Sequence, residues 1–147
     1  MKKIVLKPIS ILTVFCMVGA SYAMPSPDTE VSLEFALTIV VSPNIINIES
    51  SRIGEIRINT GFRYASYIAN GEAVFIYFNQ SDSIENIRTT RDSLGNLILK
   101  FHLEDLLDLE ENLYPDSENT VTVVLVMNNG DEFIGQDTVF LKDKRDQ

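Results

Sequence analysis

The chain has 147 residues, of which 45% are hydrophobic and 22% are charged, a balance that excludes collagenous, coiled-coil and disordered chains and indicates one globular domain. Acidic residues outnumber basic ones by 21 to 12, and the resulting net charge of −9 argues against a nucleic-acid partner. One histidine and one cysteine cannot build a zinc cluster or a disulfide framework.

The first 23 residues have the three parts of a secretory signal peptide. A start with three lysines is followed by a mostly apolar stretch over residues 9–20, and then by small residues at the −3 and −1 positions of a cleavage site, Ser21 and Ala23. We therefore expect a secreted or periplasmic protein that is cleaved after Ala23. The net charge is −9 for the whole chain and becomes −12 for the remaining 124 residues, because the three lysines are removed. The cysteine is removed with them.

Two other interpretations of this leader fit less well. A membrane anchor needs about 20 apolar residues, which is longer than the stretch here, and no second such run follows, so we expect no membrane span after cleavage. A lipid-attachment cysteine needs a small residue before it, whereas Cys16 follows Phe15.

After a polar lead-in over residues 24–30, the chain shows the alternating pattern of β-strands. Apolar and polar residues alternate over residues 31–41, which predicts a strand that ends at Ser42-Pro43-Asn44. Shorter alternations predict strands around Ile46 and Ile48 and around Ile56 and Ile58, with a turn at residues 52–54 between them and Gly61 at the end of the second.

The middle of the chain predicts further strands. Asn70-Gly71 is typical of a hairpin turn in which both residues have positive φ. Residues 73–78 are apolar on both faces, which favours a central strand over an edge open to another chain. Residues 84–91 predict another strand, and a turn over residues 92–96 leads to an alternating strand over residues 97–101.

One helix and one hairpin complete the pattern. Leucines at helical spacing over residues 103–113, bounded by Pro115, predict a short helix. Strands over residues 121–127 and 133–141 are joined by a turn at residues 128–130, and residues 143–147 form a charged tail. Seven to eight short strands predict an all-β sandwich or small barrel over residues 31–142, and a helical crossover between sheets fits a Greek-key sandwich.

Four stretches resemble a small immunoglobulin-like module of secreted bacterial and archaeal proteins. They are residues 37–50, 95–101, 120–123 and 129–139, and the resemblance spans residues 35–141. It implies an immunoglobulin-like fold and an extracellular or periplasmic location, and the module has no settled activity to transfer.

Relatives of this module often carry an Asp-rich loop that resembles a calcium site. Here the loop runs from Arg91 to Asn96 and keeps one carboxylate, Asp92, with Leu94 where a ligand would stand. Calcium takes six to eight oxygen ligands, so we expect no metal site and no cofactor.

Candidate chemistry is sparse in the sequence. His102 has no neighbouring nucleophile or metal ligand, so we expect a structural role and no catalytic residues. Acidic residues cluster around the predicted helix and could bind calcium weakly or act as paired acid-base carboxylates. The solvent-exposed face of an amphipathic helix explains them better. They are Glu104, Asp105, Asp108, Glu110, Glu111, Asp116 and Glu118. Asn79-Gln80-Ser81 matches a glycosylation acceptor, a pattern that is common by chance.

Four residues could contact a partner. The aromatic side chains of Phe62, Tyr64 and Tyr67 lie in an expected loop beside Arg63 and could stack on a sugar or a protein, although core packing is the alternative. We therefore expect a non-catalytic structural or interaction module of the cell envelope or extracellular space, with an unknown protein or glycan partner. A carbohydrate-binding module is the second hypothesis, which the absence of tryptophan weakens, and a small hydrolase is the third.

Overall fold

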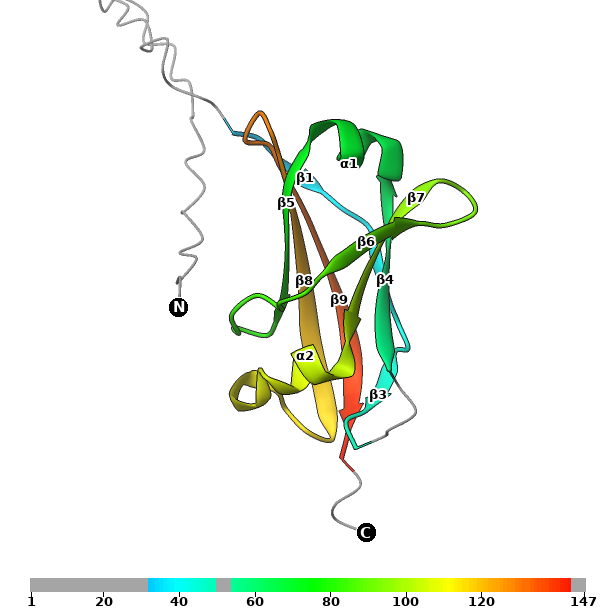
Figure 1. Cartoon of the computed structure of the whole chain (residues 1–147). Helices are drawn as coiled ribbons and strands as arrows, with labels where there is room; N and C mark the ends of the chain where they lie inside the picture. Colours follow the sequence, from blue (N-terminus) through cyan, green and yellow to red (C-terminus); the bar gives the residue numbers. More distant parts are fainter. Residues whose placement is uncertain (1–31, 50–53, 144–147) are drawn as a thin grey trace, which may run out of the picture.

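The computed structural model describes residues 32–49 and 54–143, which form two sheets packed face to face (Figure 1). The predicted leader and lead-in lie outside the described residues, as does most of the turn over residues 52–54. The five-stranded sheet holds β1 (Glu34–Ala36) and β3 (Ile45–Asn47) on one side of β9 (Glu132–Lys142), then β8 (Ser117–Met127) and β5 (Gly71–Phe78). The four-stranded sheet has the order β2 (Ile39–Ser42), β4 (Glu55–Arg63), β7 (Asn96–His102) and β6 (Arg88–Arg91).

The connections between the strands are those of an immunoglobulin-like sandwich. The chain passes from β4 to β5 through α1 (Tyr64–Asn70), and from β7 to β8 through α2 (Leu103–Leu107) and the 3-10 helix η1 (Glu110–Asn112). Each helical connection joins one sheet to the other, and the two lie at opposite ends of the sandwich (Figure 1). The predicted all-β Greek-key sandwich with a helical crossover is therefore confirmed. Within the described residues, no helix is both long enough and apolar enough to cross a membrane.

The sandwich has nine strands because the predicted first strand divides between the two sheets. Residues 34–36 pair with β9 as β1, whereas residues 39–42 pair with β4 as β2. The backbone crosses between the sheets at Leu37, whose N–H donates to the carbonyl of Ile134. A Cβ added at Gly135 would come within 2.5 Å of the Leu37 carbonyl oxygen, so a glycine at that position makes the crossing possible.

The predicted hairpin turn at Asn70-Gly71 is wrong. Asn70 ends α1, and Gly71 has an extended backbone with φ −73°. The physical reason is that β4 and β5 belong to different sheets, and a two-residue turn cannot span the gap between them. The segment from Tyr64 to Asn70, where no helix was expected, makes the crossing instead.

The prediction of a central strand at residues 73–78 is also wrong, because β5 is an edge strand that pairs with β8 alone. Among the residues that the structure describes, the apolar ones on its outer face pack against each other and not under a further layer: Phe75 and Tyr77 stack there, with their ring centroids 6.3 Å apart. The strand expected over residues 84–91 begins only at Arg88, while Ile84 reaches the core from the preceding loop.

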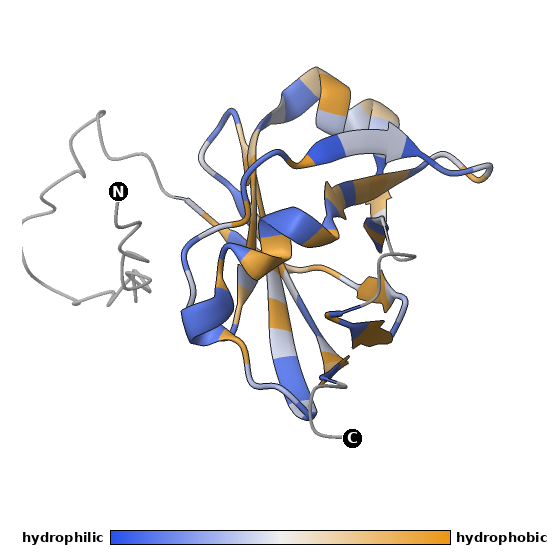
Figure 2. Ribbon diagram, turned by 60° about the horizontal axis from the view of Figure 1, so that its bottom comes forward, coloured by the Kyte–Doolittle hydropathy of each residue, from blue (hydrophilic) through white to orange (hydrophobic). Residues whose placement is uncertain are grey.

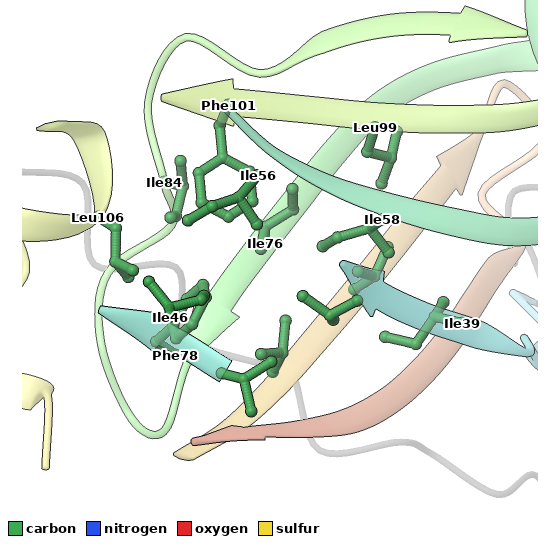
Figure 3. Close-up of a cluster of buried hydrophobic side chains, with 14 of the residues drawn as sticks. Ile39, Ile46, Ile56, Ile58, Ile76, Phe78, Ile84, Leu99, Phe101 and Leu106 are labelled. Carbon is green, nitrogen blue, oxygen red and sulfur yellow. The ribbon is translucent and has the colours of Figure 1, made fainter. Parts of the chain in front are cut away.

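Hydrophobic and hydrophilic residues follow one another along the strands (Figure 2). The apolar side chains of the inner faces of both sheets form one core (Figure 3). The rings of Phe78 and Phe101 meet edge to face at 6.1 Å between the two sheets. Leu103 and Leu106 close one end of the core from α2. Apolar side chains fill most of the space between the sheets, and the two buried polar residues, Thr60 and Asn119, form hydrogen bonds.

The turns at residues 92–96 and 128–130 are confirmed. Gly95 and Gly130 have φ values of +83° and +87°, which glycine adopts without strain. Each turn joins neighbouring antiparallel strands, β6 to β7 and β8 to β9.

Candidate functional site

The four predicted contact residues lie where β4 ends and α1 begins, at one end of the sandwich (Figure 1). Phe62 and Arg63 are the last residues of β4, and Tyr64 and Tyr67 belong to α1. Residues three apart lie on the same side of a helix. The two tyrosines therefore face the same way, whereas a strand would have turned them apart.

The three aromatic side chains are partly used by the core. Phe62 meets Phe133 edge to face at 4.8 Å, and Tyr64 and Tyr67 also pack against the core cluster. Partial burial raises the pKa of the Tyr67 hydroxyl above its usual value. Little of these rings is therefore open to stack on a ligand.

Arg63, Ile68 and Leu94 are among the exposed residues of α1 and the segments beside it. Leu94 and Ile68 are 74% and 60% exposed, and Arg63 is exposed as well. The Arg63 guanidinium donates to the carbonyl of Leu94 at 3.2 Å, which ties β4 to the β6–β7 turn. We call Arg63, Ile68 and Leu94 the terminal surface. It offers apolar contact and one cation, and none of its three side chains is an acid, a base or a nucleophile at neutral pH.

The β6–β7 turn uses its single carboxylate internally. Asp92 Oδ1 accepts hydrogen bonds from the backbone N–H groups of Leu94 and Asn96, both at 2.8 Å. These bonds, that from Asn96 first, lower the pKa of the Asp92 carboxyl below its usual value despite some desolvation. Asp92 therefore acts as the brace of the turn.

His102 and the acidic cluster lie at the opposite end of the sandwich. His102 Nδ1 is 3.0 Å from the Gly54 carbonyl oxygen, and the His102 backbone N–H donates to Asp105 at 3.1 Å. Asp105 also accepts from Asn86 at 3.0 Å, so this carboxylate holds the start of α2 to the loop before β6. In the part of the chain that the structure describes, no three His, Cys, Asp or Glu side chains are grouped to hold a metal ion.

Charges on the outer face of the four-stranded sheet form one small cluster. Glu55 accepts a hydrogen bond from Arg88 at 2.7 Å and lies 3.4 Å from the Lys100 ammonium. The Arg88 hydrogen bond is the main cause that lowers the pKa of the Glu55 carboxyl. All three side chains contact water, so the cluster contributes little to stability.

A polar network that the sequence pattern did not predict holds the crossover. Asn119 is fully buried, and its carboxamide bonds to both backbone groups of Tyr114 and to Asn79. The Asn79 amide also donates to the carbonyl of Asn112 at 2.6 Å, so the nitrogen of the glycosylation-like pattern is already engaged. The missed signal was an asparagine in register with Val121 and Val123 on the inner face of a strand.

One solved structure similar to this chain is a bacterial immunoglobulin-like domain from the M. primoryensis ice-binding adhesin. The two share 17% sequence identity with a TM-score of 0.39, over 75% of this chain and 99% of the other. No protein-family model matches the sequence, and no curated protein matches it significantly.

Proposed function

We propose that the chain is an exported, non-catalytic structural or interaction domain of the cell envelope or extracellular space. The main support is that the polar side chains of the candidate sites hold the fold together. Asp92, Asp105 and Asn119 brace a turn, a helix start and a crossover, while most of the space between the sheets is filled by apolar side chains. The leader pattern of residues 1–23 supports export.

The terminal surface is the part of the molecule that we propose meets a protein or glycan partner. It keeps Arg63 from the predicted set, and it replaces the half-buried aromatic rings by the exposed side chains of Ile68 and Leu94. Exposed apolar side chains beside one cation suit a surface contact that buries little area.

Two measurements test this proposal. The intact mass of the exported protein should correspond to a chain that begins at Met24, and a product that keeps Lys2 or carries lipid on Cys16 contradicts export by this route. The double variant Arg63→Glu, Leu94→Ser should reproduce the phenotype that deletion of the gene produces in the native host, whereas His102→Ala should behave like the unmodified protein. If the folded His102→Ala variant alone loses function, the non-catalytic proposal is wrong and His102 takes part in chemistry.

A further inference from the structure

At β1, the edge of the five-stranded sheet carries backbone hydrogen-bonding groups that have no partner among residues 32–49 and 54–143. The Leu33 carbonyl accepts from Glu132, and the Leu37 N–H donates to Ile134, so the odd residues of this segment face β9. Backbone groups alternate in direction along a strand. The N–H and C=O groups of Glu34 and Ala36 therefore point away from β9, and all three residues of β1 are exposed.

Apolar side chains flank this open edge. Leu33 and Phe35 are 52% and 40% exposed. One face of the Phe35 ring stacks on Phe133 at 4.9 Å, and Phe133 in turn meets Phe62. Phe35 is thus the exposed last member of a row of three aromatic rings that reaches the core.

The edge of β5 is closed by the loop that follows it. The Ser83 hydroxyl accepts from the Ile76 N–H at 3.2 Å, and the Ile76 carbonyl accepts from Ile84 at 2.8 Å. The Ser81 hydroxyl accepts from the Phe78 N–H, and a bulge near Glu72 bends the start of the strand.

The edges of the four-stranded sheet are also protected. On β2, the N–H of Val41 donates to Asp137 at 2.9 Å. On β6, Arg88 and Arg91 place like charges at both ends of a four-residue strand. Proteins commonly protect sheet edges by such capping and by charge. β1 carries one charge, Glu34, but among the described residues no side chain or loop caps its outward backbone groups.

We propose that β1 is a self-association edge, at which two copies of this chain pair their β1 strands antiparallel about a two-fold axis at Phe35. Glu34 then lies opposite Ala36 of the other copy, so that no like charges face each other and the outward groups of both residues form four hydrogen bonds. The two Phe35 rings meet at the centre, where the closest side-chain pairing of an antiparallel ladder occurs. The contact is closed because it uses the same segment on both copies.

The first test is sedimentation equilibrium of the exported protein at concentrations up to about 1 mM, the range suited to so small a contact. The weight-average mass should rise toward twice that of the monomer. Because two strongly acidic copies repel each other, added salt should strengthen the dimer, whereas it would weaken the binding of a basic partner. A monomer at all concentrations and salt levels overturns the proposal.

Matched variants locate the contact. Ala36→Pro removes an outward N–H that has no acceptor in the described part of the chain. The variant should therefore weaken the dimer at least about tenfold without lowering the melting temperature, since proline is tolerated on edge strands. Ala36→Ser keeps the N–H and should dimerise like the unmodified chain. An Ala36→Pro protein that folds and dimerises normally contradicts pairing through β1.

Cross-linking fixes the register independently of the proline variant. In a Cys16→Ser background, Phe35→Cys should form an intermolecular disulfide on mild oxidation, because residues opposite at the axis lie within disulfide range. Glu34→Cys should not, because Glu34 faces Ala36 and not its own copy. Equal cross-linking by both variants, or by neither, rejects this arrangement. The proposal does not depend on export or on the terminal surface.

Discussion

At the scale of single residues, Asn119 tests how the crossover between the sheets is held. Its buried carboxamide accepts from the Tyr114 N–H at 2.8 Å and donates to the Tyr114 and Ser117 carbonyls. Asn119→Leu leaves these backbone groups without partners and should lower the free energy of unfolding by about 3 kcal/mol in urea titrations. Thr138→Ala, on an exposed position of the same sheet, should change it by less than about 0.5 kcal/mol. Similar losses in both variants would refute a specific role for Asn119.

Gly135 tests the close approach of the chain where it changes sheets. A methyl group there would come within 2.5 Å of the Leu37 carbonyl oxygen and 2.8 Å of the Ile39 side chain. Gly135→Ala should therefore cost about 1–3 kcal/mol, as overpacked sites do. Gly54→Ala is the matched control, because a Cβ at Gly54 has no neighbour within 4 Å. Thermal melts of the two variants should differ clearly, and coincident melts would show that the crossing tolerates a side chain.

Asp92 tests the charge of the brace in the β6–β7 turn. Because hydrogen bonds lower its pKa in the folded protein from 3.8, its carboxylate stabilises the fold above pH 3.8, and this contribution disappears as the pH falls through the folded value. Asp92→Asn keeps an acceptor oxygen but loses the charge. The variant should be less stable than the unmodified chain at neutral pH and equally stable in strong acid. A stability difference that is constant with pH would exclude this electrostatic role.

At the scale of elements, the β8–β9 hairpin depends on Gly130. Its φ of +87° lies in the region that β-branched residues resist most. Gly130→Val should lower the free energy of unfolding by about 1–2 kcal/mol, whereas Gly130→Asn should cost less, because asparagine tolerates this conformation better. Urea titrations of the two variants compare their free energies of unfolding. Equal losses in Gly130→Val and Gly130→Asn would argue against backbone strain at this position.

Alternation of apolar residues predicted which segments form strands, but not to which sheet each belongs. Apolar and polar residues alternate over residues 31–41 without a break, yet the chain changes sheets at Leu37. The space for that crossing is provided by Gly135, nearly a hundred residues later, so the local pattern could not predict it. Asn70-Gly71 is locally suited to a tight turn, and only the placement of β4 and β5 in different sheets prevents it. Both errors arise from contacts between residues distant in the sequence.

The candidate site shows the same limit. The sequence predicted that Phe62, Arg63, Tyr64 and Tyr67 lie together, as they do in the structure. Because a loop was expected there, the direction in which each aromatic side chain points could not be predicted. Folding of Tyr64 and Tyr67 into one helix face turns both toward the core and leaves Ile68 exposed. Leu94 joins this surface only because β6 and β7 form a hairpin beside β4. No local pattern in the sequence could have indicated that contact.

At the scale of the whole molecule, stability should come from apolar packing and hydrogen bonds, without a disulfide or a bound metal. Cleavage after Ala23 would remove the only cysteine, and the oxygens of Asp92 already accept hydrogen bonds from its own turn. The core spans both sheets as one cluster, so unfolding should be a single cooperative transition.

The melting temperature of this transition should not depend on calcium or on disulfide bonds, which stabilise many small exported domains. Melts with millimolar calcium, with chelator and with a thiol reductant should coincide, because only binding to the folded state raises the melting temperature, and only a disulfide would make a reductant lower it. Differential scanning calorimetry is the measurement, and the ratio of calorimetric to van't Hoff enthalpy near one checks the single transition. A calcium-dependent rise of several degrees that saturates at one equivalent would reveal a metal site that the turn at Asp92 does not provide. Two resolved transitions would instead show that the two sheets do not share one cooperative core.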